Sequence, residues 1–472
     1  MTKFDFDAKL RGSDGTTLPV YCEVQLPSVG GQKAMIRLAV PAQYLTERPP
    51  ANPCVLSGKS GAIAFNMQEL HWRSFPTSSR GALGLEFIEL LHIERLSVSR
   101  SQAGTVREIR FHLAPISFLR KESSFVCFGD KSHSEDLFTL DLPDLGATRF
   151  VAEWVTTYHR DAEVPGATVV AGFSAVANLP SEGPIDADKM VAKFKSSLEV
   201  LSVLFRQAVT LHGWTYTDGE TVSTWIAPLA PNVTPSARED RGDFVARPQA
   251  FAESATKLVH AYGNANKKTR SLVRHLSVAV NPHRQSRTED HFLFMFSALE
   301  RVIESALRMD RTAGSPAITD NAVAELLKRL QKSVAAEGGE NAAEISARIE
   351  GLIGVVNRPS VRDKFDAFFR VYPVMVNYCA DIWPILGSEK ERGLREIRNA
   401  MSHGRGSFVS LDVVSVAEWH LAILLERVIF VLLDMDLPDG ISPGSFLLRI
   451  GGRGWYERDF WIPLRSKPDQ SI

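Results

Sequence analysis

The chain has few cysteines and almost no net charge. Its 472 residues include four cysteines, Cys22, Cys54, Cys127 and Cys379, which lie far apart and form no Cys-x-x-Cys pair. This spacing argues against a disulfide framework and against a zinc site. The formal net charge of -1 argues against a molecule that binds nucleic acid through its overall charge, so any basic patch has to be local.

The sequence also lacks long apolar runs and the common nucleotide and metal motifs. The longest run, Leu421 to Leu433, contains Glu426 and Arg427 and is too short and too charged to span a bilayer. The first residues lack the apolar core of a signal peptide. No Gly-x4-Gly-Lys-Ser/Thr or His-Glu-x-x-His is present, and Ser57-Gly-Lys-Ser-Gly61 is interpreted as a hairpin turn. We therefore expect a cytoplasmic protein with no membrane contact, no metal and no cofactor.

The first part of the chain is predicted to be rich in strands. Short segments there mix branched and aromatic residues with polar ones, and turn-forming residues separate them. They include Leu18–Leu26, Met35–Val40, Arg107–Leu113, Phe125–Phe128 and Phe150–Thr157. Gly81–Ser97 fits either a strand or a helix. This pattern is typical of an antiparallel sandwich or barrel-like module.

The second part is predicted to be helical from about Ala252 to Met435, because apolar residues recur there at helical spacing. The clearest helices are His291–Leu307, Asn321–Val334, Ala342–Val355, Val361–Val371, Lys390–Ser402 and Val413–Leu433. We therefore predict an α+β multidomain protein, with a β-rich, sandwich-like domain followed by an all-α bundle. Its expected parts are a β-rich regulatory domain (1–182), a mixed connecting region (183–284), a helical domain (285–437) and a tail with the composition of a hairpin (438–472).

The pattern Arg-x4-His occurs three times, as Arg107…His112, Arg270…His275 and Arg398…His403. The spacing alone therefore identifies no site. The first copy lies in a predicted strand, where alternation puts the two side chains on opposite faces, so we interpret it as structural. The second lies in a basic segment without a glycine that would end a helix.

The third copy lies on the polar face of the predicted helix Lys390–Ser402. The apolar face consists of Leu394, Ile397, Ala400 and Met401. A turn of ~100° per residue spreads Arg398, Asn399 and His403 across the other face. Gly404 follows and can end the helix. The alternative is a solvated helix end, where a histidine is favourable near the C-terminal carbonyls.

The segment Phe294-Met-Phe-Ser-Ala-Leu-Glu300 adds context to this motif. It belongs to an amphipathic helix in which Glu300 is surrounded by apolar residues, so that Glu300 could face Arg398 in a helical bundle and orient it by a charge-assisted hydrogen bond. This helix, followed later by Arg398-Asn-x3-His-Gly404, resembles a HEPN domain. The order of a β-rich module before the helices resembles the Apea-like branch, whose members act as single-gene anti-phage ribonucleases.

The resemblance implies a metal-independent RNA endonuclease of abortive-infection type that works as a homodimer. In it His403 would be the general acid/base, Arg398 would stabilise the scissile phosphate, Asn399 would orient His403 or the phosphate, and Glu300 would hold the arginine. The RNA target suggested by the family is transfer RNA. The β-rich module would be a sensor for a phage-derived trigger. Some HEPN proteins carry a tyrosine two residues after the histidine for regulation by a nucleotidyltransferase; Arg405 stands there in this chain, so we do not expect that route.

One basic block stands out in the neutral chain. Lys257–Arg287 contains seven basic residues and no acidic one. We predict phosphate contacts for a subset of its residues and for one arginine beyond the motif. These are Lys267, Lys268, Arg270, Arg274 and Arg405. The alternative for this block is a solvated helix face.

Two other functions fit the sequence. The first is a non-catalytic HEPN-like module that dimerises and binds RNA or a partner protein. The second is a β-sandwich protein that binds a ligand and dimerises through its helices. The intact Arg398, Asn399 and His403 favour the nuclease.

Overall fold

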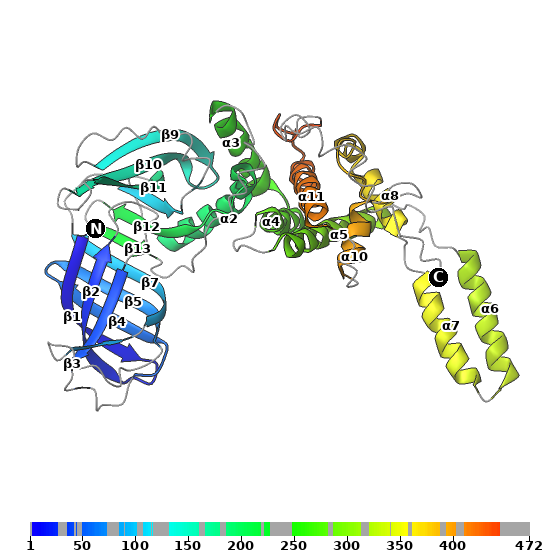
Figure 1. Cartoon of the computed structure of the whole chain (residues 1–472), viewed down its shortest axis with the longest axis horizontal. Coiled ribbons are helices and arrows are strands. Elements are labelled where there is room, and N and C mark those ends of the chain that lie inside the picture. The colour runs from blue at the N-terminus through cyan, green and yellow to red at the C-terminus, as the bar shows by residue number, and fades with distance from the viewer. Residues whose placement is uncertain are drawn as a thin grey trace. The chain divides into compact units, whose positions relative to one another are not determined.

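The computed structural model describes most of the chain: residues 2–26, 35–41, 44, 50–72, 85–88, 90–101, 107–114, 116, 132–159, 166–179, 186–218, 221–226, 248–281, 287–312, 321–339, 341–356, 361–387, 393–402 and 410–443. It is a mixed α/β protein, with the strands in the N-terminal half and most helices in the C-terminal half (Figure 1). The chain forms two compact units. One contains Met1–Arg270, Val280–Ser286 and Pro438–Gly440, and the other contains Ser271–Ala279, Arg287–Leu437 and Ile441–Ile472.

The strands of the first unit form an antiparallel ladder in the order β6-β3-β2-β1-β4-β5-β7-β13-β12-β8-β11-β10-β9. Their bounds are β1 Thr2–Gly12, β2 Thr17–Leu26, β3 Met35–Pro41, β4 Cys54–Ser60, β5 Ile63–Trp72, β6 Leu85–Ile88, β7 Leu90–Ser101, β8 Arg107–Leu113, β9 Ser132–Leu142, β10 Gly146–His159, β11 Gly166–Asn178, β12 Leu211–Asp218 and β13 Thr221–Ile226. The ladder has two halves, which meet where β7 pairs with β13.

Alternation along the strands builds the core of the first half. In β2 the residues Leu18, Val20, Cys22 and Val24 are buried, while their neighbours are more exposed. Phe6 stacks on Phe65 with ring centroids 4.5 Å apart. A Cβ atom at Gly58 would lie 2.6 Å from the Phe6 ring, so this core requires glycine there.

The predicted strands are confirmed where the structure describes them. Leu18–Leu26, Met35–Val40 and Arg107–Leu113 correspond to β2, β3 and β8, and Phe150–Thr157 lies within β10. The ambiguous segment Gly81–Ser97 contains β6 and most of β7, so its described residues are strands. Phe125–Phe128 lies outside the described residues.

The second half of the ladder packs on two helices, α2 (Ala187–Phe205) and α3 (Pro248–Asn264). Phe111 of β8 stacks on Phe194 of α2 at 3.9 Å, and Phe205 contacts Phe251 of α3 at 5.2 Å. The strands β12 and β13 follow α2 in sequence but pair with β8 and β7. The boundary expected at residue 182 therefore falls inside this unit.

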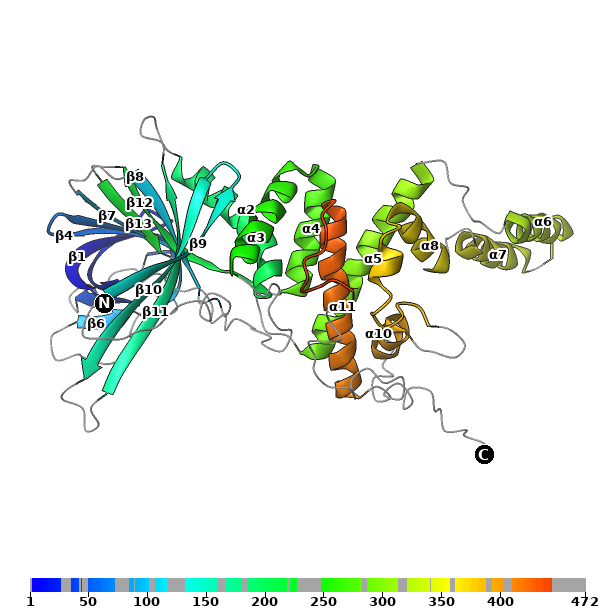
Figure 2. The ribbon, with the colours of Figure 1, turned by 90° about the horizontal axis from the view of Figure 1, so that it is seen from above.

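The remaining helices are α4 Lys267–Val280, α5 Thr288–Thr312, α6 Asn321–Glu337, α7 Ala342–Val356, α8 Val361–Val371, α9 Met375–Tyr378, α10 Leu394–Ser402 and α11 Leu411–Leu432. All six helices predicted in this region are present. The long helix α5 packs against α8, α10 and α11, and Figure 2 shows α11 beside it. Helix α4 carries residues of both units.

Helix α11 is buried along most of its length, including its charged residues Glu418, Glu426 and Arg427. Arg427 donates hydrogen bonds to Asp381 and to the carbonyl oxygens of Tyr378 and Ile441, so its charge is paired inside the unit. In the described part of the chain, no helix combines the length and apolar character needed to cross a membrane. The tail expected to form a hairpin lies outside the described residues from 444 onward.

Candidate functional site

Helix α10 carries the third Arg-x4-His copy and is held at its N-terminus by backbone contacts. The amide nitrogens of Gly387 and Gly393 donate to Oε2 of Glu396 at 3.0 and 2.7 Å, which caps the first turn. The amide of Leu394 donates to the carbonyl oxygen of Pro384 at 2.8 Å. A Cβ atom at Gly393 would lie 2.6 Å from that oxygen, so the close approach depends on glycine.

The apolar face predicted for α10 is inside the helical unit. Leu394 and Ile397 are buried, whereas Ala400 and Met401 are half-buried. This packing fixes the rotation of the helix, and it leaves Arg398 and Asn399 on the partly exposed side. The helix fixes the direction of Arg398 before any ligand binds.

Arg398 contacts both polar residues that the sequence placed beside it. Its Nη2 atom donates to Oε2 of Glu300 on α5 at 3.4 Å, and its Nη1 atom donates to Oδ1 of Asn399 at 3.2 Å. The side chains of Arg398 and Glu300 are 34% and 45% exposed, so solvent reaches the pair. The contact expected between Glu300 and Arg398 is therefore present.

These contacts leave the guanidinium able to bind a ligand. Arginine has five N–H donors in a planar fork, and the two contacts above use two of them. A phosphate oxygen can accept from the others at the exposed edge of Arg398. Because the pair is partly solvated, it orients the side chain more than it stabilises the fold.

Two members of the predicted site have no structural description. His403 and Arg405 lie outside the described residues, as does Gly404. The described part of helix α10 runs from Leu394 to Ser402, so the end predicted for this helix borders residues outside the described part of the chain. Arg398, Asn399 and Glu300 therefore come together in the structure, and the position of the histidine rests on its place in the sequence.

The first Arg-x4-His copy, Arg107…His112, has the structural role expected of it. In β8, His112 contacts Oγ1 of Thr215 through Nε2 at 2.8 Å and Oγ of Ser174 through Nδ1 at 3.5 Å. Burial, with smaller contributions from Arg110 and His212, lowers the pKa of His112 to about 4. A histidine that is neutral at pH 7 and enclosed between strands is part of the sheet.

The second Arg-x4-His copy, Arg270…His275, lies on α4. No acidic side chain is among the contacts that the structure describes for it. His275 packs edge-on against Phe294, with ring centroids 6.0 Å apart. Burial lowers its pKa, and the charge of Arg301 lowers it further. Arg270 is exposed on the same helix. The environment of His275 is thus aromatic, unlike that of the Arg398 motif.

Helix α4 presents the predicted basic residues to solvent. Lys267, Lys268, Arg270 and Arg274 are all exposed. At ~100° per residue, Lys267, Arg270 and Arg274 fall within about 60° of one another on the helix surface. Leu272, Val273 and Leu276 are buried on the other side. This geometry suits phosphate contact, and it equally suits a solvated face.

Helix α5, which carries Glu300, is fixed at both ends by contacts that the sequence did not reveal. Near its start, the buried His291 bonds to Glu418 of α11 and to the carbonyl oxygen of Ala279. Near its end, Asp310 accepts from Arg370 of α8 at 2.7 Å, which raises the pKa of that arginine. Partners this far apart in sequence give no periodic signal, and only the fold brings them together.

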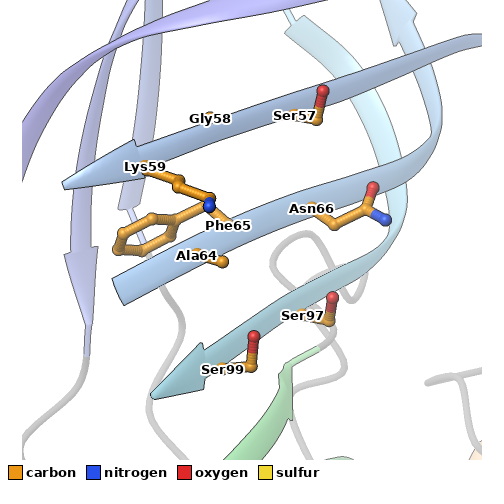
Figure 3. Close-up of a pocket in the computed structure, with 8 residues that line it drawn as sticks. All are labelled: Ser57, Gly58, Lys59, Ala64, Phe65, Asn66, Ser97 and Ser99. Carbon is orange, nitrogen blue, oxygen red and sulfur yellow. The ribbon is translucent and has the colours of Figure 1, made fainter. Parts of the chain in front are cut away.

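The strand-rich unit contains a separate groove of about 460 Å³ on β4, β5 and β7 (Figure 3). Ser57, Asn66 and Ser97 form one cross-strand row, and Lys59, Ala64 and Ser99 form the next row. The Oδ1 atom of Asn66 is buried and has no hydrogen-bond partner among the described residues. Residues 61 and 62 form a tight turn between β4 and β5, so a hairpin is present, but of the segment Ser57–Gly61 only Gly61 lies in the turn and Ser57–Ser60 belong to β4.

Comparisons with protein-family models, with curated proteins and with solved structures find no match to this chain. The case for a function therefore depends on the site geometry and the motif residues.

Proposed function

We propose that the protein is a metal-independent RNA endonuclease of the HEPN type, with the helices from α5 to α11 as its HEPN bundle. The observation that carries this proposal is the contact of Arg398 with Glu300 and Asn399 on the partly exposed side of α10. This contact orients Arg398 so that it can bind a phosphate. His403 follows five residues later in the sequence. Defence against phage by abortive infection is the setting that the family resemblance suggests.

The chemistry needs few protein groups because RNA supplies its own nucleophile, the ribose 2′-hydroxyl. A base removes the proton from this hydroxyl as its oxygen attacks the adjacent phosphorus. An acid protonates the departing 5′-oxygen, and a cation stabilises the charge that develops on the phosphate. The products are a 2′,3′-cyclic phosphate and a 5′-hydroxyl.

In this proposal His403 performs the proton transfers and Arg398 binds the scissile phosphate. Asn399 orients the arginine through the 3.2 Å contact, and Glu300 restricts the same side chain from α5. One histidine fills one proton-transfer role per step. A symmetric pair of chains therefore supplies both an acid and a base.

Two further surfaces fit an RNA enzyme that is regulated. The exposed basic side of α4 would contact phosphates without reading sequence. The groove on β4, β5 and β7 is the candidate surface at which the strand-rich unit would sense a trigger. Transfer RNA is the first substrate to test.

The test compares purified full-length variants on RNA in EDTA. His403→Ala and Arg398→Ala should each lower cleavage by about 100-fold or more, as loss of an acid/base or of a phosphate-binding charge does. His275→Ala is the matched control, because it removes a histidine at the same spacing from an arginine, and it should retain activity. Wild-type cleavage rates in His403→Ala protein would refute the proposal.

A non-catalytic module that binds RNA or a partner protein is the second candidate. The observation that favours it is the Glu300 contact itself, since an ion pair between α5 and α10 also serves as a structural link. This candidate predicts RNA binding without cleavage. It also predicts the same toxicity in cells for wild type and His403→Ala.

A further inference from the structure

Helices α6 and α7 form an antiparallel hairpin in the helical unit (Figure 1). The Nε2 atom of Gln331 donates to the carbonyl oxygen of Ser346 at 3.4 Å, which places these two residues at the same level of the hairpin. Ile349 is buried in the seam between the helices, and Leu327 and Val334 are half-buried beside it.

One side of this hairpin is apolar and exposed. Leu326 and Leu330 of α6 are 64% and 51% exposed, and Ile345 and Leu352 of α7 are 44% and 53% exposed. At ~100° per residue, each pair lies close together on its own helix, at about 90° from the seam. Because the helices are antiparallel, both pairs lie on the same side. These four residues are called the hairpin face.

The register divides the hairpin face into two layers. With Gln331 level with Ser346, Leu326 lies beside Leu352 and Leu330 lies beside Ile345. Contiguous large aliphatic side chains with this exposure are uncommon on a surface that stays in water, and they mark a contact site. The hairpin has its own seam, so the exposed face is not required to hold α6 to α7.

We propose that the hairpin face binds the same face of a second copy of this chain, forming a four-helix bundle. A two-fold axis parallel to the helices brings each layer of one copy into contact with the same layer of the second copy. Two copies of Leu326 and Leu352 then meet in one layer, and two copies of Leu330 and Ile345 meet in the other. The same residues meet because the interface is symmetric: the same patch of each copy makes the contact, so no different binding surface is needed.

The net charge of each helix favours one of the two ways of stacking the hairpins. Among its described residues α6 has the basic Lys328, Arg329 and Lys332 against Glu325 and Glu337, an excess of one positive charge. Helix α7 has Glu344 and Glu350 against Arg348, an excess of one negative charge. The axis parallel to the helices puts α6 over the partner's α7, so that a helix with an excess of one positive charge lies on a helix with an excess of one negative charge. Stacking α6 on α6 would bring like charges together.

The available area is sufficient for a specific dimer. A helix of 17 residues is about 25 Å long, and two packed helices are about 20 Å wide. One side of the hairpin therefore offers roughly 500 Å², and two copies bury about 1,000 Å² in total, near the lower limit for a specific interface. The inference concerns assembly and does not depend on the nuclease proposal. If both the nuclease proposal and this interface are correct, the interface keeps two copies of the Arg398 motif in one dimer even when no RNA is bound.

The test measures the mass of the full-length protein by sedimentation equilibrium. Wild type should associate into pairs, and Leu326→Glu/Leu352→Glu protein should associate roughly 100-fold more weakly or not at all, because four carboxylates would be buried in one layer. Val55→Glu is the matched control, since Val55 is 45% exposed on β4 and lies outside the hairpin. The altered residues are exposed, and an unchanged circular dichroism melt confirms that the variant is folded.

A mixed cross-link tests the orientation. Chains with Leu326→Cys and chains with Leu352→Cys, carrying tags of different mass, should form a mixed disulfide when they are combined and oxidised. Wild type under the same conditions is the control. A single-copy wild type, or a Glu variant that pairs as tightly as wild type, would overturn the proposed interface. Cross-links only between identical variants would overturn the stacking of α6 on α7.

Discussion

Arg398 on α10 donates a hydrogen bond to Glu300 on α5, with 3.4 Å between Nη2 and Oε2. The two residues are 98 positions apart in the sequence. The contact joins the helix that carries the motif to the helix fixed by His291 and Asp310. Glu300 is therefore a positioning residue for Arg398 in our account.

Replacing Glu300 tests this positioning role. Glu300→Ala should lower kcat by about 10-fold with a smaller change in KM, because a misaligned arginine mainly loses contact with the transition state. Glu300→Asp should restore part of the loss. The melting temperature should change little, since the pair is partly exposed. An unchanged kcat for Glu300→Ala would remove Glu300 from the site.

Gly393 should be necessary for the placement of α10. An alanine there puts Cβ at 2.6–2.7 Å from backbone atoms of Pro384, Leu386 and Gly387. Gly393→Ala should destabilise the helical unit by about 2 kcal/mol or more in a denaturant titration. Gly351 in α7 is the control, because a Cβ there meets nothing within 4 Å. Gly351→Ala should stabilise slightly, and equal effects at both positions would contradict the close approach seen at Gly393.

The basic side of α4 should contribute to RNA affinity and to its salt dependence. Lys267→Glu/Lys268→Glu protein should bind RNA more weakly and show a shallower slope of log K against log salt, since fewer counterions are released. Lys189→Glu/Lys195→Glu, at exposed positions on α2, makes the same charge change elsewhere in the same unit. If both double variants give the wild-type slope, α4 does not contact phosphates.

The strand-rich unit should lose stability in mild acid through His112. Its pKa is about 4 in the folded protein, against an ordinary value of 6.5. The unfolded chain therefore binds the proton first, and stability falls as pH drops from about 6.5 towards 4, by up to about 3 kcal/mol. His112→Gln should flatten this dependence in melts between pH 7 and pH 4. A slope equal to that of wild type would contradict the buried neutral state of His112.

The helices and the Glu300 contact could be predicted because their signals are local or chemical. The apolar spacing of α10 predicted the face on which Leu394 and Ile397 are buried. The pairing of Glu300 with Arg398 was suggested by their opposite charges and by the position of Glu300 among apolar residues of an amphipathic helix.

Other features depend on partners that are distant in sequence. Strands β12 and β13 lie in the region 183–284, which was predicted only as a mixed connecting region, and nothing in their sequence indicated that they would insert between β7 and β8. Glu418 and Arg427 lie on a nearly all-apolar helix, and their buried partners His291 and Asp381 come from other segments. Such pairs leave no periodic pattern, so sequence reasoning could not find them.

The chemistry of the RNA ends is the most direct test of the central claim. Purified wild-type protein should cut transfer RNA in EDTA, and the fragments should carry a 2′,3′-cyclic phosphate and a 5′-hydroxyl. These ends show that the ribose 2′-hydroxyl attacked the phosphate, as expected of a site built from Arg398 and His403. Fragments with a 5′-phosphate, or cleavage that stops in EDTA, would contradict the account.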